Sequence, residues 1–416
     1  MTARVGPPSL LFVGGASPLP SSVHLATEML TQARARGIET HLVNKAEVLE
    51  ATREVCELAD AVHALDPDRP EDCVRWARDR AAEGLHFDAV LGLRDPVQFS
   101  AAELTGVFGA AGNPIDAVRR VRNKDACREA LAAAGFRQPS VWLCSDLDDA
   151  ARALRESAGP WVVKPRDGLG SIGVRLVTGP EDLARAVDEL PTQDPFLVEG
   201  FVTGPEFSVE GVFVGGGAKV LAITAKEKLP PPYFVELGHV LPAELPEETR
   251  KEIDQEVTAA LDALDLRFGV FHVELWLTQD GVVLGEVHAR PGGDWLHRLL
   301  TYAIPGLEFF GPVFDDLLGR PPGPLPVATR AAAVRFLAPP PGRLLRIDGW
   351  ERVASHPAVL YAGLFVEPGG VIRPVRDSGD RAGVVVVGAE TPARALELAA
   401  ELARSVEFEV EPAGGA

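Results

Sequence analysis

The stretch HVELWLTQDGVVLGEVHARPGG, residues 272–293, has the pattern of two strands joined by a glycine-containing turn. Glu274 and Glu286 fall on successive strands, and His288 and Arg290 alternate with Glu286, so the last three side chains share one side of their strand. Two inward-facing carboxylates repel each other unless a cation lies between them. The pattern therefore indicates a cation site, beside which the permanently charged, planar guanidinium of Arg290 suits a phosphoryl group.

A second stretch, WVVKPRDGLGSIGVRLV (residues 161–177), places a glycine-rich turn between two strands. The glycine loops of P-loop and Rossmann proteins open a helix and offer its N-terminus to phosphate. Because this turn leads back into a strand, it would hold phosphate with backbone N–H groups and nearby cations. Lys164 ends the incoming strand, where its ammonium can reach a phosphate. The alternative is a surface hairpin with an unrelated lysine.

The N-terminal part, residues 1–115, alternates strands (9–14, 38–44 and 88–93) with helical periodicity, which predicts a parallel sheet with crossover helices. Its first turn, GGASPLPSS (14–22), does not match GxGxxG, and we expect Pro18 and Pro20 to break the helix start. A simple strand-to-helix turn is the preferred interpretation, and a substrate-shaping role stays open. A Rossmann oxidoreductase is disfavoured because the glycine fingerprint and the ribose-binding acid are both missing.

The remaining chain alternates helical and strand patterns around one Pro-rich linker candidate at residues 321–326. We expect helices at 123–137, 146–159, 181–190, 247–264, 305–319 and 392–406, and strands at 138–145, within 196–216 and at 218–228. The predicted domains are an N-terminal α/β domain (1–115), a central lid (116–205), a core with the metal site (206–325) and a C-terminal α+β module (326–416).

Composition excludes several classes of protein. The chain has 416 residues, and its 41 Lys and Arg against 60 Asp and Glu give a formal charge of −19, which argues against nucleic acid or an anionic membrane as partner. Four scattered cysteines without a CxxC pair argue against a zinc site and suit a reducing cytoplasm. We see no secretory h-region and no apolar run long enough for a membrane span, so a cytoplasmic location is expected.

From about Asn123 to Gly319 the chain resembles the ATP-grasp superfamily, specifically its L-amino-acid and other carboxylate–amine ligases. The resemblance rests on the lysine of RNKDACREALAAAGF (122–136), the lysine before the glycine hairpin, the hinge EGFV (199–202) with Glu206, and the 272–293 hairpin. It implies an α/β protein with an ATP-grasp fold that is α+β in its central part. In that fold a Rossmann-like N-terminal domain precedes a lid, a core and a C-terminal α+β module.

The resemblance also implies roles for individual residues. ATP would be bound by Lys124, Lys164, Gly168, Gly170, Ser171, Glu199, Phe201, Val202 and Glu206. Mg²⁺ would be bound by Glu274, Glu286 and His288. The substrate would contact His239, Arg290 and Gly293, with Arg290 and Lys164 as the catalytic residues.

Several of these positions have a second interpretation. The family usually has asparagine where this chain has His288, so three roles stay open: a metal ligand, a ligand that favours Mn²⁺, or a hydrogen-bond donor to phosphate. His239 and His272 are equally well explained as packed or solvated side chains. Lys226 and Lys228 border the nucleotide or the substrate, or they belong to a solvated strand face.

The implied reaction joins a carboxylate, such as an L-amino acid, to an amine through an acyl phosphate, giving ADP, phosphate and an amide. An ATP-grasp carboxylase that uses bicarbonate is the alternative, because the segments 341–353 and 379–390 resemble a module of both branches. A non-catalytic ATP-binding protein is a third interpretation. The expected partners are the two small substrates, without nucleic acid or membrane, and a homodimer is expected from the resemblance alone.

Overall fold

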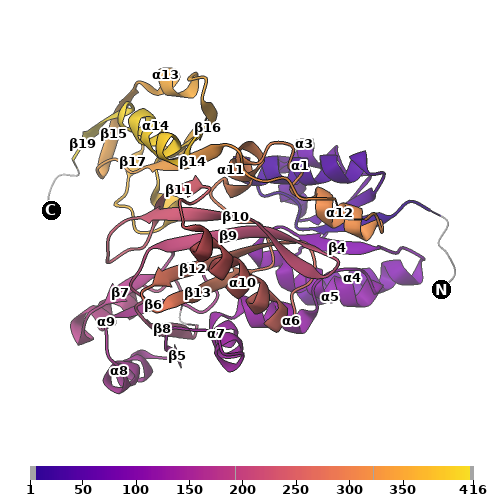
Figure 1. The fold of residues 1–416 in the computed structure, drawn as a ribbon, viewed down its shortest axis with the longest axis horizontal. Coiled ribbons are helices and arrows are strands. Elements are labelled where there is room, and N and C mark those ends of the chain that lie inside the picture. Colours follow the sequence, from indigo (N-terminus) through magenta and orange to yellow (C-terminus); the bar gives the residue numbers. More distant parts are fainter. Residues whose placement is uncertain (1–5, 193, 322, 413–416) are drawn as a thin grey trace.

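The computed structural model describes residues 6–192, 194–321 and 323–412. It contains a four-stranded N-terminal sheet, a four-stranded lid sheet, an eight-stranded central sheet and a three-stranded C-terminal sheet. In Figure 1 the N-terminal elements lie at the right, the lid helices α8 and α9 at the lower left, and the C-terminal elements at the upper left. The large sheet runs between these parts.

The N-terminal sheet is parallel throughout, with the order β3-β2-β1-β4, which confirms the predicted fold class. All five residues of β1 are buried, as expected for a parallel strand covered on both faces. Its elements are β1 (Ser9–Val13), α1 (Pro20–Ala35), β2 (Glu39–Asn44), α2 (Ala46–Ala51), α3 (Arg53–Cys56), β3 (Ala61–Ala64), α4 (Pro70–Ala82), β4 (Ala89–Gly92), η1 (Asp95–Val97), α5 (Gln98–Phe108) and α6 (Ile115–Arg122).

The start of α1 corrects one expectation from the sequence. Pro20 does not break the helix, because it is the first helical residue. At that position the missing N–H would have had no intrahelical partner, and the fixed φ of proline suits the helix. The proline therefore favours a helix start here.

The lid sheet has the order β5-β8-β6-β7, with antiparallel neighbours, and α8 and α9 pack against it through a small apolar core. The glycine-rich turn joins β6 to β7, and Gly170, Ser171 and Gly173 all have positive φ there. Its elements are α7 (Lys124–Ala133), β5 (Val141–Cys144), α8 (Leu147–Glu156), β6 (Trp161–Pro165), β7 (Arg175–Val177), α9 (Pro180–Asp188) and β8 (Phe196–Gly200).

The central sheet is antiparallel, with the order β13-β12-β9-β10-β11-β14-β18-β16. The predicted hairpin forms β12 and β13, with His272 opposite His288. Its strands are β9 (Glu206–Val214), β10 (Gly217–Lys228), β11 (Glu236–Leu241), β12 (Val270–Thr278), β13 (Gly281–His288), β14 (Ala331–Leu337), β16 (Val359–Leu364) and β18 (Gly383–Ala389). Helices α10 (Glu247–Ala263), α11 (Leu296–Ala303) and α12 (Gly311–Leu317) complete this part, and α11 was not predicted.

The C-terminal residues form β15 (Gly342–Asp348), α13 (Trp350–Ala354), β17 (Val371–Ile372), η2 (Ser378–Asp380), α14 (Pro392–Arg404) and β19 (Glu407–Glu411). The three strands make a sheet of order β17-β15-β19, and α14 covers β14 and β18 through a shared apolar cluster. Because β14, β16 and β18 lie in the central sheet, that sheet crosses the boundary expected at residue 325. The three boundaries between the four expected domains stay a prediction.

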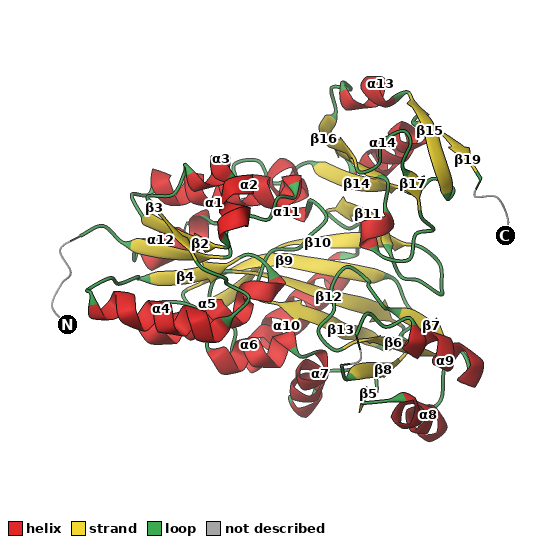
Figure 2. Cartoon of the chain, turned by 180° about the vertical axis from the view of Figure 1, so that it is seen from behind, coloured by secondary structure: helices red, strands yellow, loops and turns green. Residues whose placement is uncertain are grey.

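One core cluster joins the N-terminal sheet to the central sheet. It contains Leu10 and Phe12 of β1, Val212 of β9 and Phe309 and Phe310 ahead of α12. The seen-from-behind view in Figure 2 shows α1, α2 and α11 beside one another above the central strands. Among the described helices, none is long and apolar enough to cross a membrane.

Gly211 is the tightest steric point of the central sheet. It pairs with Phe271, whose ring covers it, so an added Cβ would lie 2.1 Å from Phe271 Cζ and 2.4 Å from the Lys219 carbonyl oxygen. We expect Gly211→Ala to reduce the free energy of unfolding by about 1–3 kcal/mol, because the ring and strand must shift.

The measurement is the midpoint of urea denaturation. The matched control is Gly217→Ala in the same hairpin, where a Cβ would meet only the Val214 carbonyl oxygen at 3.7 Å. Equal midpoints for the two variants would contradict the steric account.

Candidate active site

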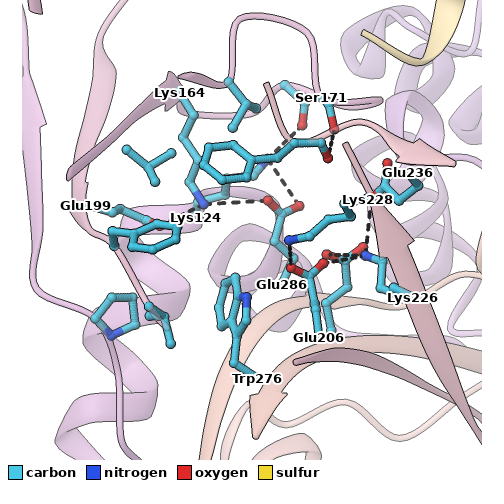
Figure 3. Close-up of a pocket in the computed structure, with 18 of the residues that line it drawn as sticks. Lys124, Lys164, Ser171, Glu199, Glu206, Lys226, Lys228, Glu236, Trp276 and Glu286 are labelled. Atoms are coloured by element: carbon cyan, nitrogen blue, oxygen red, sulfur yellow. Dashed lines mark hydrogen bonds and ion pairs between the residues drawn. The ribbon is translucent and has the colours of Figure 1, made fainter. Parts of the chain in front are cut away.

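A cavity of about 550 Å³ lies between the glycine turn of the lid and the central sheet, within the roughly 300–1,000 Å³ range usual for small-molecule sites. Figure 3 shows lysines and glutamates from both sides pointing into it. Of the predicted site residues, those that line it are Lys124, Lys164, Gly168, Gly170, Ser171, Glu199, Phe201, Val202, Glu206, Glu274, Glu286, His288 and Arg290. His239 and Gly293 are not among its lining residues.

Lys164 is held at the lid side of the cavity by a buried ion pair. Its ammonium lies 2.8 Å from Glu199 Oε2, on the neighbouring strand β8, and both residues are about 95% buried (5% and 4% exposed). Arg128 also binds Glu199, with Nε 3.1 Å from Oε1, and donates to the Leu284 carbonyl oxygen at 2.6 Å. Burial opposes ionisation of Glu199, but the two cations outweigh it and lower its pKa to about 2.

Sequence reasoning did not identify Arg128. The available signal was its spacing, because it follows Lys124 by four residues and therefore lies on the same face of α7. Through its bonds to β13 carbonyls, Arg128 joins the lid to the β12–β13 hairpin.

Glu286 lies between two lysines of the lid region. Its Oε2 is 3.4 Å from the Lys124 ammonium, and its Oε1 is 3.6 Å from that of Lys164. Lys124 also donates to the Gly168 carbonyl oxygen at 2.7 Å, at the start of the glycine turn. Burial and the nearby Glu274 raise the pKa of Glu286, yet Lys124, His288 and Lys164 outweigh them and keep the carboxyl ionised.

Lys226 has three carboxylates around it at the opposite side of the cavity (Figure 3). Its ammonium is 2.8 Å from Glu206, 3.1 Å from Glu274 and 3.2 Å from Glu236. Its side chain is only 2% exposed, so the solvated-face interpretation is wrong for this lysine. Burial would lower the pKa of Lys226, but the carboxylates raise it well above its usual value. Lys228 forms a further ion pair with Glu206.

His272 contacts two carboxylates and lies near the start of β12 in the β12–β13 hairpin. Its Nδ1 is 2.8 Å from Glu210 Oε1, and its Nε2 is 3.2 Å from Glu274 Oε1. Burial disfavours the charged ring, but Glu210 and Glu274 raise the pKa of His272 to about 9. Sequence reasoning missed Glu210, although it shares a strand face with Glu206 and Ser208 in a period of two.

Asp95 orients His288 and Arg290, two of the predicted site residues. Arg290 Nε donates to its Oδ2 at 2.7 Å, and His288 Nδ1 lies 3.3 Å from its Oδ1. The other nitrogen of His288, Nε2, is 3.4 Å from Glu286 Oε2. Burial raises the pKa of Asp95, yet Arg290 and His288 bring it well below its usual value. Asp95 was not predicted, although it follows the carboxyl end of a parallel strand, where ligand sites gather.

His239 belongs to a buried network beside the cavity. Its Nε2 lies 3.2 Å from Asp294 Oδ2, and Arg381 makes two hydrogen bonds to the same carboxylate, at 2.9 and 2.8 Å. Burial raises the pKa of Asp294, but His239 and Arg381 lower it overall. The substrate roles of His239 and Gly293 remain predictions.

The C-terminal part also contacts the glycine turn. The Ser378 N–H donates to the Gly170 carbonyl oxygen at 3.0 Å, and Ser171 Oγ donates to the Phe234 carbonyl oxygen at 3.4 Å. Phe234 in turn stacks on Phe201 of the hinge, with ring centroids 5.9 Å apart. The turn is therefore held over the cavity by residues from three segments of the chain.

Two family models match the chain: an ATP-grasp domain over residues 157–298 and an L-amino acid ligase C-terminal domain 2 over residues 335–411. An uncharacterised protein of Sinorhizobium fredii is 31% identical over 313 residues, which are 73% of this chain and 64% of that protein. Alanine–anticapsin ligase of Bacillus subtilis is 26% identical over 240 residues, 52% of this chain and 50% of the relative. Carnosine synthase 1 of Gallus gallus is 29% identical over 339 residues, 74% of this chain and 36% of the relative.

The chain thus spans between 36% and 64% of the length of these relatives. Among solved structures, an L-amino acid ligase from Bacillus licheniformis superposes with a TM-score of 0.80 at 24% identity, covering 98% of this chain and 100% of that one. A phosphoribosylglycinamide synthetase from Anaerococcus prevotii gives 0.69 at 17% identity, with 98% and 100% coverage. The chain therefore has the ATP-grasp fold, and residues 157–298 and 335–411 match the models of an ATP-grasp domain and of an L-amino acid ligase C-terminal domain 2.

Proposed function

We propose that this protein is an ATP-dependent carboxylate–amine ligase that forms an acyl phosphate and releases ADP, phosphate and an amide or dipeptide. The observation that carries the proposal is the cavity wall. There Glu286 pairs with Lys124 and Lys164, Glu274 pairs with Lys226, both carboxylates are ionised, and Arg290 lies beside them. This arrangement suits a polyphosphate and a transferring phosphoryl group.

ATP would lie with its phosphates under the glycine turn. Lys124 and Lys164 would pair with phosphate oxygens, and the backbone N–H groups of residues 168–173 would donate to them. The adenine would lie against the hinge, where Phe201 and Val202 line the cavity. Glu206 would accept ribose hydroxyl protons, because each carboxylate oxygen keeps a second lone pair beside its lysine.

The residues present also fit Mg²⁺. Glu274 and Glu286 offer the hard carboxylate oxygens that Mg²⁺ requires, and nearby cations keep both carboxyls ionised. When bound, the metal would neutralise charge on the transferring phosphate oxygens. His288 Nε2, 3.4 Å from Glu286, would add a nitrogen donor that tolerates Mn²⁺.

The proposed reaction has two steps, phosphoryl transfer to the substrate carboxylate and acyl transfer to the amine. The substrate carboxylate oxygen attacks the γ-phosphorus, a new O–P bond forms, and the bond to the β-phosphate oxygen breaks with release of ADP. The amine then attacks the acyl carbon, phosphate leaves with the bonding electron pair, and the nitrogen loses a proton. Arg290, which is bonded to Asp95, would stabilise the negative charge of the tetrahedral intermediate. The glycine turn excludes water, which would hydrolyse the acyl phosphate.

The amino-acid class of substrate is supported by the relatives. An L-amino acid ligase shares the fold over almost the whole chain, and alanine–anticapsin ligase and carnosine synthase 1 are sequence relatives. We therefore infer that the carboxylate donor is an L-amino acid or another small acid.

The first test measures ADP release with a panel of L-amino acids and amines, with and without bicarbonate. We expect ADP formation only when a carboxylate and an amine are both present. Stimulation by bicarbonate alone would instead indicate a carboxylase. Tight ATP binding without ADP formation by any pair would indicate a non-catalytic nucleotide-binding protein.

Glu286→Gln is expected to lower the turnover number by at least about a hundredfold, because it removes a charge that the metal and both lysines require. ATP affinity should change much less, since the hinge contacts remain. Steady-state kinetics and calorimetric ATP titration give the two numbers. Glu248→Gln, an exposed glutamate of α10, is the control. Turnover similar to that of the unmodified chain would remove Glu286 from the metal site.

His288→Asn replaces the imidazole nitrogen with the amide oxygen that the family usually has at this position. If His288 binds metal, the ratio of Mn²⁺-supported to Mg²⁺-supported turnover should fall, because Mg²⁺ favours oxygen ligands. The two rates are compared at saturating metal for both forms. An unchanged ratio would restrict His288 to hydrogen bonding with phosphate and Asp95.

A further inference from the structure

A second group of metal-ligating side chains lies between helices α1 and α11, apart from the cavity described above. His24 and Glu28 occupy one face of α1 at a spacing of four residues, and His297 lies in the first turn of α11. One donor atom from each residue lies within 4.8 Å of the other two. None of the three lines the candidate active site.

The distances are close to those of a tetrahedral site. His24 Nδ1 lies 3.1 Å from His297 Nε2 and 3.9 Å from Glu28 Oε1. Ligand atoms about 2.0 Å from a tetrahedral Zn²⁺ are about 3.3 Å apart. The two imidazole nitrogens already lie at about this separation, and the Glu28 donor atom, within 4.8 Å of both, must move closer for all three to bind one ion.

Burial makes this group costly without a cation. His297 is 2% exposed, and Glu28 Oε2 is buried without a hydrogen-bond partner among the described residues. Burial raises the pKa of Glu28 to about 7, although Arg298 lowers it. Burial, His24 and Arg298 lower the pKa of His297 to about 3, so its ring is neutral, the form that binds metals.

The surroundings fix the two rings from outside. Trp295 stacks on His297 with ring centroids 5.6 Å apart and meets His24 edge-on at 5.9 Å. Its other contact is Tyr361 of β16, at 3.8 Å between centroids. These ring contacts orient the two imidazoles. Arg298 acts electrostatically on all three groups, and its positive charge would weaken the affinity for a cation.

We propose that His24, Glu28 and His297 form a site for a divalent transition-metal ion of the Zn²⁺ class, which joins the N-terminal domain to the central sheet. Two imidazoles and one carboxylate are a ligand set that Zn²⁺ accepts, whereas Mg²⁺ prefers oxygen donors alone. The absence of CxxC pairs argues only against a zinc site built from cysteine thiolates. Three protein ligands leave a fourth position for water.

The chain supplies an internal comparison. His41 and His63 also meet with ring nitrogens 3.1 Å apart, but the nearby carboxylate, Glu39, contacts the other nitrogen of His41. His63 and Glu39 therefore lie at opposite nitrogens of the His41 ring, and the three side chains do not direct their donor atoms to one point. The His41–His63 pair, which lacks a converging carboxylate, is therefore the matched control for the group of His24, Glu28 and His297.

The experiment titrates the full chain with ZnCl₂ by calorimetry, without ATP, and follows thermal unfolding in parallel. All forms carry His288→Asn, which keeps that imidazole from competing for Zn²⁺. We expect one Zn²⁺ per chain and a rise in the unfolding midpoint. Glu28→Gln and His297→Gln should each weaken Zn²⁺ binding by at least about tenfold, while His63→Gln leaves it unchanged.

Glu28 lies partly exposed on α1, so its amide variant keeps the test informative even if the His297 variant unfolds. The proposal is overturned if the parent form takes up no Zn²⁺, which would leave the two histidines as a hydrogen-bonded pair. It is also overturned if Glu28→Gln binds Zn²⁺ as tightly as the parent. Neither outcome bears on ligase activity, which is measured with Mg²⁺.

Discussion

Carboxylates removed from water need cations within a few ångströms, and that requirement shapes the centre of this molecule. Strands β9, β12 and β13 carry the buried Glu206 and Glu210 and the partly buried Glu274 and Glu286 to the base of the cavity. Lys226 of β10 compensates the charges of Glu206 on β9 and Glu274 on β12. Lys124 and Lys164 reach Glu286 from the lid region. The lid is thus attached to the core by the same charges that a nucleotide and its metal would contact. A bound polyphosphate would take over these lysines.

The same constraint explains why the site extends beyond the ATP-grasp domain at residues 157–298. Lys124, Arg128 and Asp95 all precede that segment, and Ser378 and Arg381 follow it. Asp95 sets the direction of Arg290, and Arg128 supports Glu199 from behind. Catalytic geometry in such a site depends on contacts between segments that are hundreds of residues apart in the chain.

Local sequence patterns predicted the parts of the structure with short-range causes. The β12–β13 hairpin, the glycine turn and the parallel N-terminal sheet follow from alternation, turn residues and periodicity. The partners of those residues could not be predicted in the same way, because Asp95 meets Arg290 only after the whole chain has folded. Glu210 was overlooked although it alternates with apolar residues on the face of Glu206 and Ser208, because its partner His272 lies 62 residues further along the chain. His239 likewise meets Asp294 and, through it, Arg381, which are 55 and 142 residues further along the chain.

The position of β14 in the central sheet has a practical consequence for fragments of this protein. Residues 332–335 of β14 pair with Gly238–Leu241 of β11, and β18 then continues the sheet on the far side. A fragment ending before residue 331 would leave the backbone N–H and C=O groups of β11 open to solvent. Exposed edges of this kind recruit strands from other molecules. The C-terminal residues therefore also protect the edge of β11 from aggregation. A fragment that ends where the ATP-grasp match ends, at residue 298, would lack this protection.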